Sequence, residues 1–171
     1  MSVLHASVLT AFKQRGWAYR SVADAEVIEA DFEAHHTKVC LHVQSFGESG
    51  VLSVVADASF PVPRTHFLAV SELLMRTNKV LNLGNFELDW DEGRVMFRVS
   101  NLFQPNRVDE RIVSGLVYAA VAEMDRLTPF LSIVCRTPAG ELLLLRITEL
   151  MSREDLLPPE PKEEDTPAPR V

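Results

Sequence analysis

Cys40 and His42 are the strongest candidates for metal ligands in the sequence. They stand two positions apart in a stretch, 37–46, where apolar and polar residues alternate as on a β-strand. Side chains two apart on a strand share one face about 6–7 Å apart, so this thiol and imidazole could bind one transition metal. A neighbouring strand could add a third ligand from Asp31, Glu33 and His35. Because such pairs are common on polar strand faces, a metal-dependent protein or enzyme is only the alternative function.

An acidic cluster, DWDEG, follows a short alternating stretch later in the chain. Its acids, Asp89, Asp91 and Glu92, span too few positions to supply the ligands of an EF-hand loop. Asp91 favours a turn through side-chain hydrogen bonds, and Gly93 tolerates the positive φ that such turns require. The cluster therefore predicts a hairpin turn.

The remaining polar motifs do not predict catalysis. Neither cysteine lies in a Gly-flanked elbow, no serine has a G-x-S-x-G context, and the chain has no P-loop or G-x-G-x-x-G motif. His35 and His36 are adjacent, so on a strand they would point to opposite faces, and a surface loop is the simpler interpretation. We predict no catalytic residue, no metal site and no cofactor, and we expect that the protein is not an enzyme.

Charge and composition exclude several other classes. The 171 residues include 17 basic and 24 acidic side chains, for a net charge of -7, which disfavours nucleic-acid binding. Two cysteines are too few for a disulfide framework. The start of the chain does not resemble a secretory signal, and no stretch approaches the roughly 20 apolar residues that cross a bilayer. We expect a cytoplasmic protein without a membrane partner.

The elements that would position these residues follow an α+β pattern. Helical and strand periodicities alternate, and Gly and Pro residues separate the segments. The predicted helices are Val3–Arg15, ended by Gly16, then Arg64–Leu81, Val108–Leu127, interrupted by Pro129, and Pro138 to about Met151. The predicted strands are Glu26–His35, Thr37–Phe46 and Val51–Phe60, and three strands in succession imply an antiparallel meander. Phe86–Trp90 and Arg94–Phe103 follow as a β-hairpin, so we predict an α+β fold with an antiparallel sheet.

The composition changes after Met151. Residues 152–171 hold half of the ten prolines, with three basic and six acidic residues. Such a segment buries too little apolar surface to fold. We predict a folded domain over 1–151 and a Pro-rich, acidic, disordered tail over 152–171.

The stretch from Leu68 to Phe103 resembles the YbjN family of small bacterial proteins. In that family a helix leads through an Asn-containing junction to a strand, an acidic Gly-bearing turn and a strand with an aromatic-Arg pair. The matching residues are Asn78, Leu83, Gly84, Phe86, Leu88, Asp89, Gly93, Phe97 and Arg98. The resemblance implies a type III secretion chaperone-like fold of α-β-β-β-α-β-β-α order, to which the helix from Pro138 would be an addition. It also implies a regulatory or chaperone-like protein that binds proteins and often forms a dimer.

Two apolar features indicate an interface. The helix predicted over Val108–Leu127 is apolar on more than one side, and four leucines follow one another near the C-terminus. Either the last helix covers the long helix within the monomer or a second subunit does, and the resemblance favours a homodimer. The candidate interface residues are Ile112, Leu116, Leu142, Leu143, Leu144 and Leu145. We predict a non-enzymatic, chaperone-like or regulatory protein-binding module; a structural domain without a client is a third interpretation.

Overall fold

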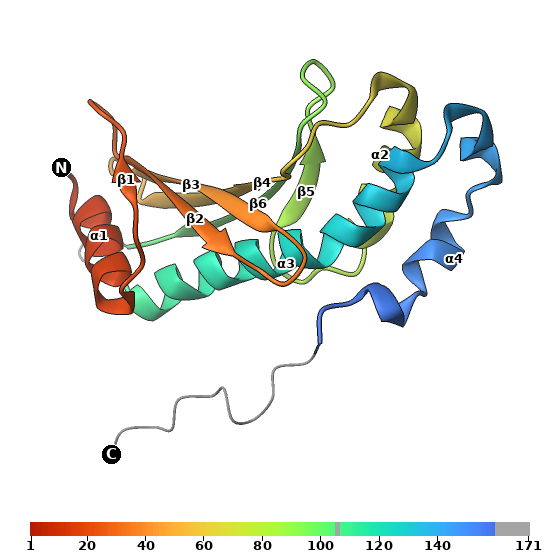
Figure 1. Ribbon diagram of the computed structural model, residues 1–171. Coiled ribbons are helices and arrows are strands. Elements are labelled where there is room, and N and C mark those ends of the chain that lie inside the picture. Colours follow the sequence, from red (N-terminus) through yellow and green to blue (C-terminus); the bar gives the residue numbers. More distant parts are fainter. Residues whose placement is uncertain (105–106, 160–171) are drawn as a thin grey trace.

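Six antiparallel strands form one sheet, and the longest helix runs along one of its faces (Figure 1). This computed structural model describes residues 1–104 and 107–159. The strands are β1 (Arg20–Ser21), β2 (Val27–Glu33), β3 (Lys38–Phe46), β4 (Val51–Asp57), β5 (Asn85–Leu88) and β6 (Val95–Leu102). The helices are α1 (Val3–Arg15), α2 (Phe67–Asn78), α3 (Glu110–Arg136) and α4 (Ile147–Met151), with short 3-10 helices η1 (Arg64–His66), η2 (Ala139–Leu144) and η3 (Glu154–Leu156).

The strand order is β1-β2-β3-β4-β6-β5, so the predicted three-strand meander and the predicted hairpin join through β4 and β6. The fold class expected from the sequence, α+β with an antiparallel sheet, is confirmed. The sequence pattern did not predict β1, which adds two residues at the edge beside β2. Alternation is confirmed on β3, where Val39, Leu41 and Val43 are buried and the residues between them face the other way.

The ends of α1 follow from local sequence. The Ser2 hydroxyl accepts a hydrogen bond from the His5 backbone amide at 3.1 Å, which satisfies one free donor of the first turn. Gly16 ends the helix with φ of 68°, a conformation that favours glycine. Its buried side chains, including Val8 and Phe12, join the core between α1 and the sheet.

The prediction that Pro129 interrupts the long helix is wrong, because α3 continues to Arg136 with Pro129 inside it. A proline within a helix removes one backbone hydrogen bond and costs about 3 kcal/mol. Beyond it, Phe130, Leu131 and Val134 are all buried in the core. Burial of each such side chain contributes about 1.5–3 kcal/mol, so packing outweighs the local penalty.

The single helix predicted from Pro138 to Met151 is also wrong. A 3-10 helix, η2, is followed by extended backbone at Leu145 and Arg146 before the five-residue α4 begins. Ile147 and Leu150 of α4 are buried, and packing continues past the expected domain end at 151 to Leu157. The tail predicted over 152–171 lies partly outside the described residues, which end at 159.

Within residues 1–104 and 107–159, no helix has both the length and the apolar character needed to cross a membrane.

Candidate protein-binding surface on the open face of the sheet

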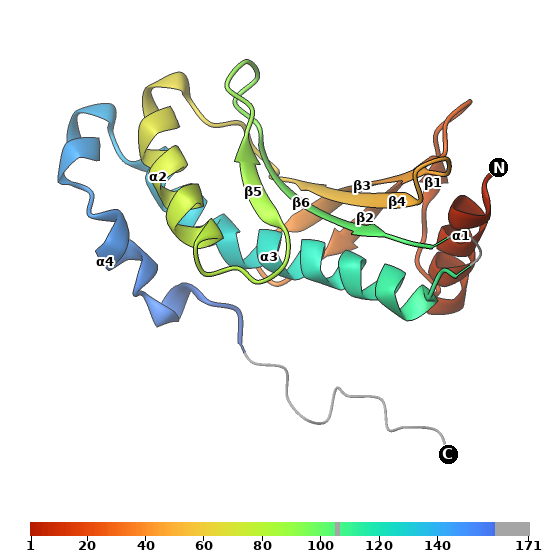
Figure 2. The same ribbon diagram turned by 180° about the vertical axis from the view of Figure 1, so that it is seen from behind.

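The sheet has one face covered by helices and one without a helix over it. Figures 1 and 2 show α3 along the covered face, with α1 and α2 towards the two ends of the sheet. No described helix lies over the opposite face, which we call the open face. Its side chains come from alternate positions of the strands and include Arg20, Glu29, Asp31, Cys40, His42, Gln44, Val55, Asp57, Met96 and Arg98.

Strand register arranges these side chains in two rows across the sheet. One row runs from β1 to β6 through Arg20, Glu29, His42, Val55 and Arg98. The second row runs from β2 to β5 through Asp31, Cys40, Asp57, Met96 and Glu87. Side chains directly opposite one another on neighbouring strands lie within contact distance, so each row is a continuous band.

The middle of the open face is hollow, with a volume of about 760 Å³. Val55 lies at its floor and is only 8% exposed, although no described helix covers it. Long side chains on the neighbouring strands surround this valine, since His42 and Arg98 are its cross-strand partners. The open face is therefore a shallow concave surface with an apolar floor.

Ion pairs line the edges of the hollow. Arg98 donates to both oxygens of Glu87, at 2.9 Å and 3.1 Å, and this lowers the pKa of the Glu87 carboxyl. Lys38 lies 3.2 Å from Asp31, and Arg20 pairs with Glu29. Exposed pairs of this kind add little stability, but they fix the positions of charges that a partner would meet.

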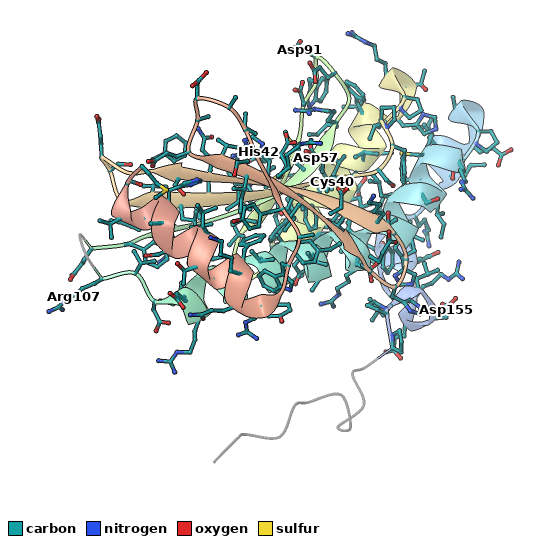
Figure 3. The ribbon with its side chains drawn as sticks, turned by 60° about the vertical axis from the view of Figure 1, so that its left-hand side comes forward. Cys40, His42, Asp57, Asp91, Arg107 and Asp155 are labelled. Atoms are coloured by element: carbon teal, nitrogen blue, oxygen red, sulfur yellow. The ribbon has the colours of Figure 1, made fainter. Side chains whose placement is uncertain are left out.

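Cys40 and His42 share the open face, as predicted (Figure 3), but a hydrogen bond to Asp31 disfavours the thiolate form of Cys40. The Cys40 thiol donates to Asp31 at 3.0 Å, and this hydrogen bond, together with burial, raises the pKa of Cys40. The same bond lowers the pKa of Asp31. Both metal binding and nucleophilic attack require the thiolate, which this arrangement disfavours.

The proposed third ligands do not complete a metal site. Asp31 pairs directly with Cys40 across the strands, whereas Glu33 pairs with Lys38 further along, and His35 lies beyond the end of β2. Across the part of the chain that the structure describes, no three His, Cys, Asp or Glu side chains are grouped so as to hold a metal ion.

His35 and His36 lie in the β2–β3 turn, where their rings pack edge to face with 4.6 Å between the ring centroids. His36 also contacts Asp125 of α3, a residue that no local sequence pattern marks as functional. Asp125 is 4% exposed and accepts hydrogen bonds from the backbone amides of His36 and Thr37, at 2.6 Å and 3.2 Å. This buried carboxylate fastens the hairpin to α3 on the covered side.

The DWDEG segment forms the predicted hairpin turn, in which Gly93 has φ of 72°. The side chain that makes the turn is Asp89, not Asp91 as expected. Asp89 accepts from the backbone amides of Asp91 and Glu92, at 2.8 Å and 3.0 Å. Its earlier position lets the carboxylate reach the amides two and three residues ahead.

The residues that carry the YbjN resemblance build the corner between α2, β5 and β6. The Asn78 side chain accepts from the Phe86 amide at 2.7 Å and donates to the Phe86 carbonyl at 3.0 Å. It therefore occupies the backbone groups that an edge strand would otherwise offer to another strand. Phe86 packs against Phe97 at 4.9 Å, and Gly84, at φ of 75°, leaves room for the Phe97 ring.

The candidate interface residues do not form one surface. Leu116 is 4% exposed and belongs to the core, so its side chain is not accessible to a partner. Leu143 and Leu144 are 98% and 80% exposed on η2, whereas Leu142 and Leu145 are half-buried. Ile112 is exposed on α3, in a different element from the leucines.

Comparison with known proteins identifies the fold. No protein-family profile matches the chain, and no curated protein matches it in sequence. YbjN from E. coli, a proposed transcription regulator, superposes with a TM-score of 0.53 at 11% identity, covering 79% of this chain and 92% of YbjN. The chain has a YbjN-like fold.

A second solved structure, that of the ExsC–ExsE complex, extends the comparison to the type III secretion chaperone-like fold. It matches with a TM-score of 0.51 at 12% identity, covering 77% of this chain and 97% of the matched chain. At these identities the likeness concerns the YbjN-like fold alone, and the resemblance expected from the central stretch is confirmed at that level.

Proposed function

We propose that this protein is a non-enzymatic, chaperone-like or regulatory module of the bacterial cytoplasm that binds a polypeptide on its open face and acts as a homodimer. The observation that carries the proposal is the concave open face. Arg20 on β1 and Arg98 on β6 are four strand spacings apart, or about 19 Å. A shallow surface of that width, with an apolar floor, suits a protein segment better than a small ligand.

The charges on the open face support a protein partner over a nucleic acid. Arginines on the open face pair with acids: Arg98 with Glu87, Arg94 with Glu92, and Arg20 with Glu29. Phosphate recognition needs unpaired cations in a chain of favourable net charge, whereas this chain carries -7. A regulatory role would therefore operate through protein binding, and the ExsC–ExsE complex shows that a chain of similar fold binds a protein.

The test is co-purification with matched variants. Met96 lies between Asp57 and Glu87 in the register, so a lysine there meets two acids and should not disturb folding. Met96→Lys changes the middle of the open face, whereas Lys13→Glu changes an exposed position on α1. We expect one polypeptide to co-purify with the wild type and with Lys13→Glu, and to be lost with Met96→Lys. Retention of that polypeptide by Met96→Lys would remove the open face from the proposal.

A further inference from the structure

Asp57, the last residue of β4, is a carboxylate of the open face with incomplete hydrogen bonding. Its Oδ1 atom is buried and accepts no hydrogen bond from any group in the described part of the chain. Arg94 Nη1 lies 3.9 Å from this oxygen, which is beyond hydrogen-bond distance. The same guanidinium pairs more closely with Glu92, through Nε at 3.1 Å. Asp57 can therefore accept a hydrogen bond from a further donor.

The other two acids that line the hollow already have closer partners. Glu29 pairs with Arg20. Asp31 lies 3.2 Å from Lys38 and accepts a hydrogen bond from the Cys40 thiol at 3.0 Å. The Asp57 side chain is 32% exposed, so a bound partner can approach the carboxylate from the hollow. Asp57 is thus the acid of the hollow to which a donor from a partner adds most.

The residues beside Asp57 suit a long aliphatic stem. Met96 and Cys40 are its cross-strand partners, and Val55 lies two positions earlier on the same face of β4. Figure 3 shows Cys40, His42 and Asp57 together on the strands. Lysine and arginine combine an aliphatic stem, which packs on apolar surface, with a charged end that only donates hydrogen bonds. Such a side chain can lie on Val55 and Met96 while its charged end contacts Asp57.

The charges of the open face also favour a basic partner. Its three arginines, Arg20, Arg94 and Arg98, each pair closely with an acid other than Asp57, so they oppose an incoming cation only weakly. The chain carries a net charge of -7, which attracts positively charged segments over a longer range. An acidic side chain at the same place would be repelled by Asp57.

We propose that the polypeptide bound by the open face inserts a basic side chain, lysine or arginine, into the hollow. Its charged end lies on the Asp57 carboxylate, and its stem packs along Val55 and Met96. This inference rests on the polypeptide binding of the proposed function and names the chemistry of the partner. The contact makes one position of the bound segment selective for a basic residue.

Peptides of random sequence serve as the probe. A phage-displayed library of short random peptides would be selected on the wild-type protein, and the selected peptides would be synthesised with a fluorescein label. We expect these peptides to share a lysine or arginine at one position. Met96→Lys should abolish their binding, because it changes the middle of the open face.

Fluorescence polarisation then tests Asp57 itself. Asp57→Asn removes the charge and keeps the shape, and we expect it to weaken binding by about 10- to 100-fold. Asp91→Asn, the same substitution at an exposed position of the β5–β6 turn, is the matched control and should bind like the wild type. Norleucine in place of the shared basic residue should weaken binding to the wild type by a similar factor. It should weaken binding to Asp57→Asn much less, because that contact is already lost.

Two results would overturn the inference while polypeptide binding by the open face stands. One is a set of peptides that Met96→Lys excludes but Asp57→Asn binds as tightly as the wild type. The other is a set that shares no basic position, or that binds the wild type equally well with norleucine there; this result does not depend on the folding of Asp57→Asn. If no peptide is selected, or if Met96→Lys binds the selected peptides normally, the proposed binding by the open face fails together with the inference.

Discussion

Removal of the Asp125 carboxylate should loosen the hairpin between β2 and β3. Asp125→Ala leaves the backbone amides of His36 and Thr37 without their acceptor, and each unsatisfied buried donor costs about 1–3 kcal/mol. Part of this loss is offset, because the folded protein no longer buries a carboxylate. We expect a net loss of about 2–4 kcal/mol in the free energy of unfolding.

Asp125→Asn separates the hydrogen bonds from the charge. Asparagine keeps one acceptor oxygen for both amides and adds an NH₂ donor close to His36 Nδ1. That ring nitrogen is buried, has no hydrogen-bond partner among the described residues and lies 3.4 Å from the second Asp125 oxygen. We therefore expect a loss below about 1 kcal/mol for this nearly isosteric change.

Urea unfolding followed by circular dichroism measures both variants. With a slope of about 2 kcal/mol/M, Asp125→Ala should lower the midpoint by about 1–2 M and Asp125→Asn by less than about 0.5 M. Asp91→Ala, at an exposed position in the β5–β6 turn, is the control and should change it little. If Asp125→Asn cost as much as Asp125→Ala, the negative charge beside His36 would be required, and the hydrogen-bond account would be refuted.

Three further changes test other parts of the structure. Gly84→Ala should cost at least about 2 kcal/mol in urea unfolding, because φ is 75° there and a Cβ would lie 2.4 Å from Phe97 Cζ; an unchanged midpoint would contradict this. Leu144→Glu should change stability by less than about 0.5 kcal/mol, since the side chain is exposed; a large loss in the melting temperature would show that η2 is part of the core. Glu123→Gln should stabilise the folded protein at pH 7, because burial raises the pKa of the Glu123 carboxyl and its charged form destabilises the fold once the pH exceeds that pKa. The gain should vanish below pH 4.5, the usual pKa, because the carboxyl is then neutral in both states; a gain that persists there would contradict burial of the charge.

Local patterns predicted the α+β class and which residues of a strand share a face. Strand alternation depends only on neighbouring residues, so it assigned Cys40 and His42 to one face and Val39 and Leu41 to the other. It could not predict that Asp125 meets a hairpin 89 residues earlier in the chain, because long-range packing decides that contact. Long-range packing also explains why α3 continues through Pro129, because burial of the residues beyond it outweighs the local penalty of a proline inside a helix.

The leucines near the C-terminus illustrate another limit. Leu142–Leu145 resembled an apolar helix in the sequence, yet this part of the chain forms η2 and a short extended link. Side chains in such a segment point in several directions, so two of the four are exposed. The sequence could not predict which of these leucines face solvent, because a run of identical apolar residues does not specify the helix geometry.

Photo-crosslinking in living cells would show whether the open face binds a polypeptide. A photoreactive amino acid would replace His42 or Met96 on the open face, and Lys13 on α1 as the control. We predict that both open-face positions crosslink to one and the same polypeptide, identified by mass spectrometry, and that Lys13 does not. Crosslinks to no protein, or the same crosslinks from Lys13, would show that the open face is not the binding surface.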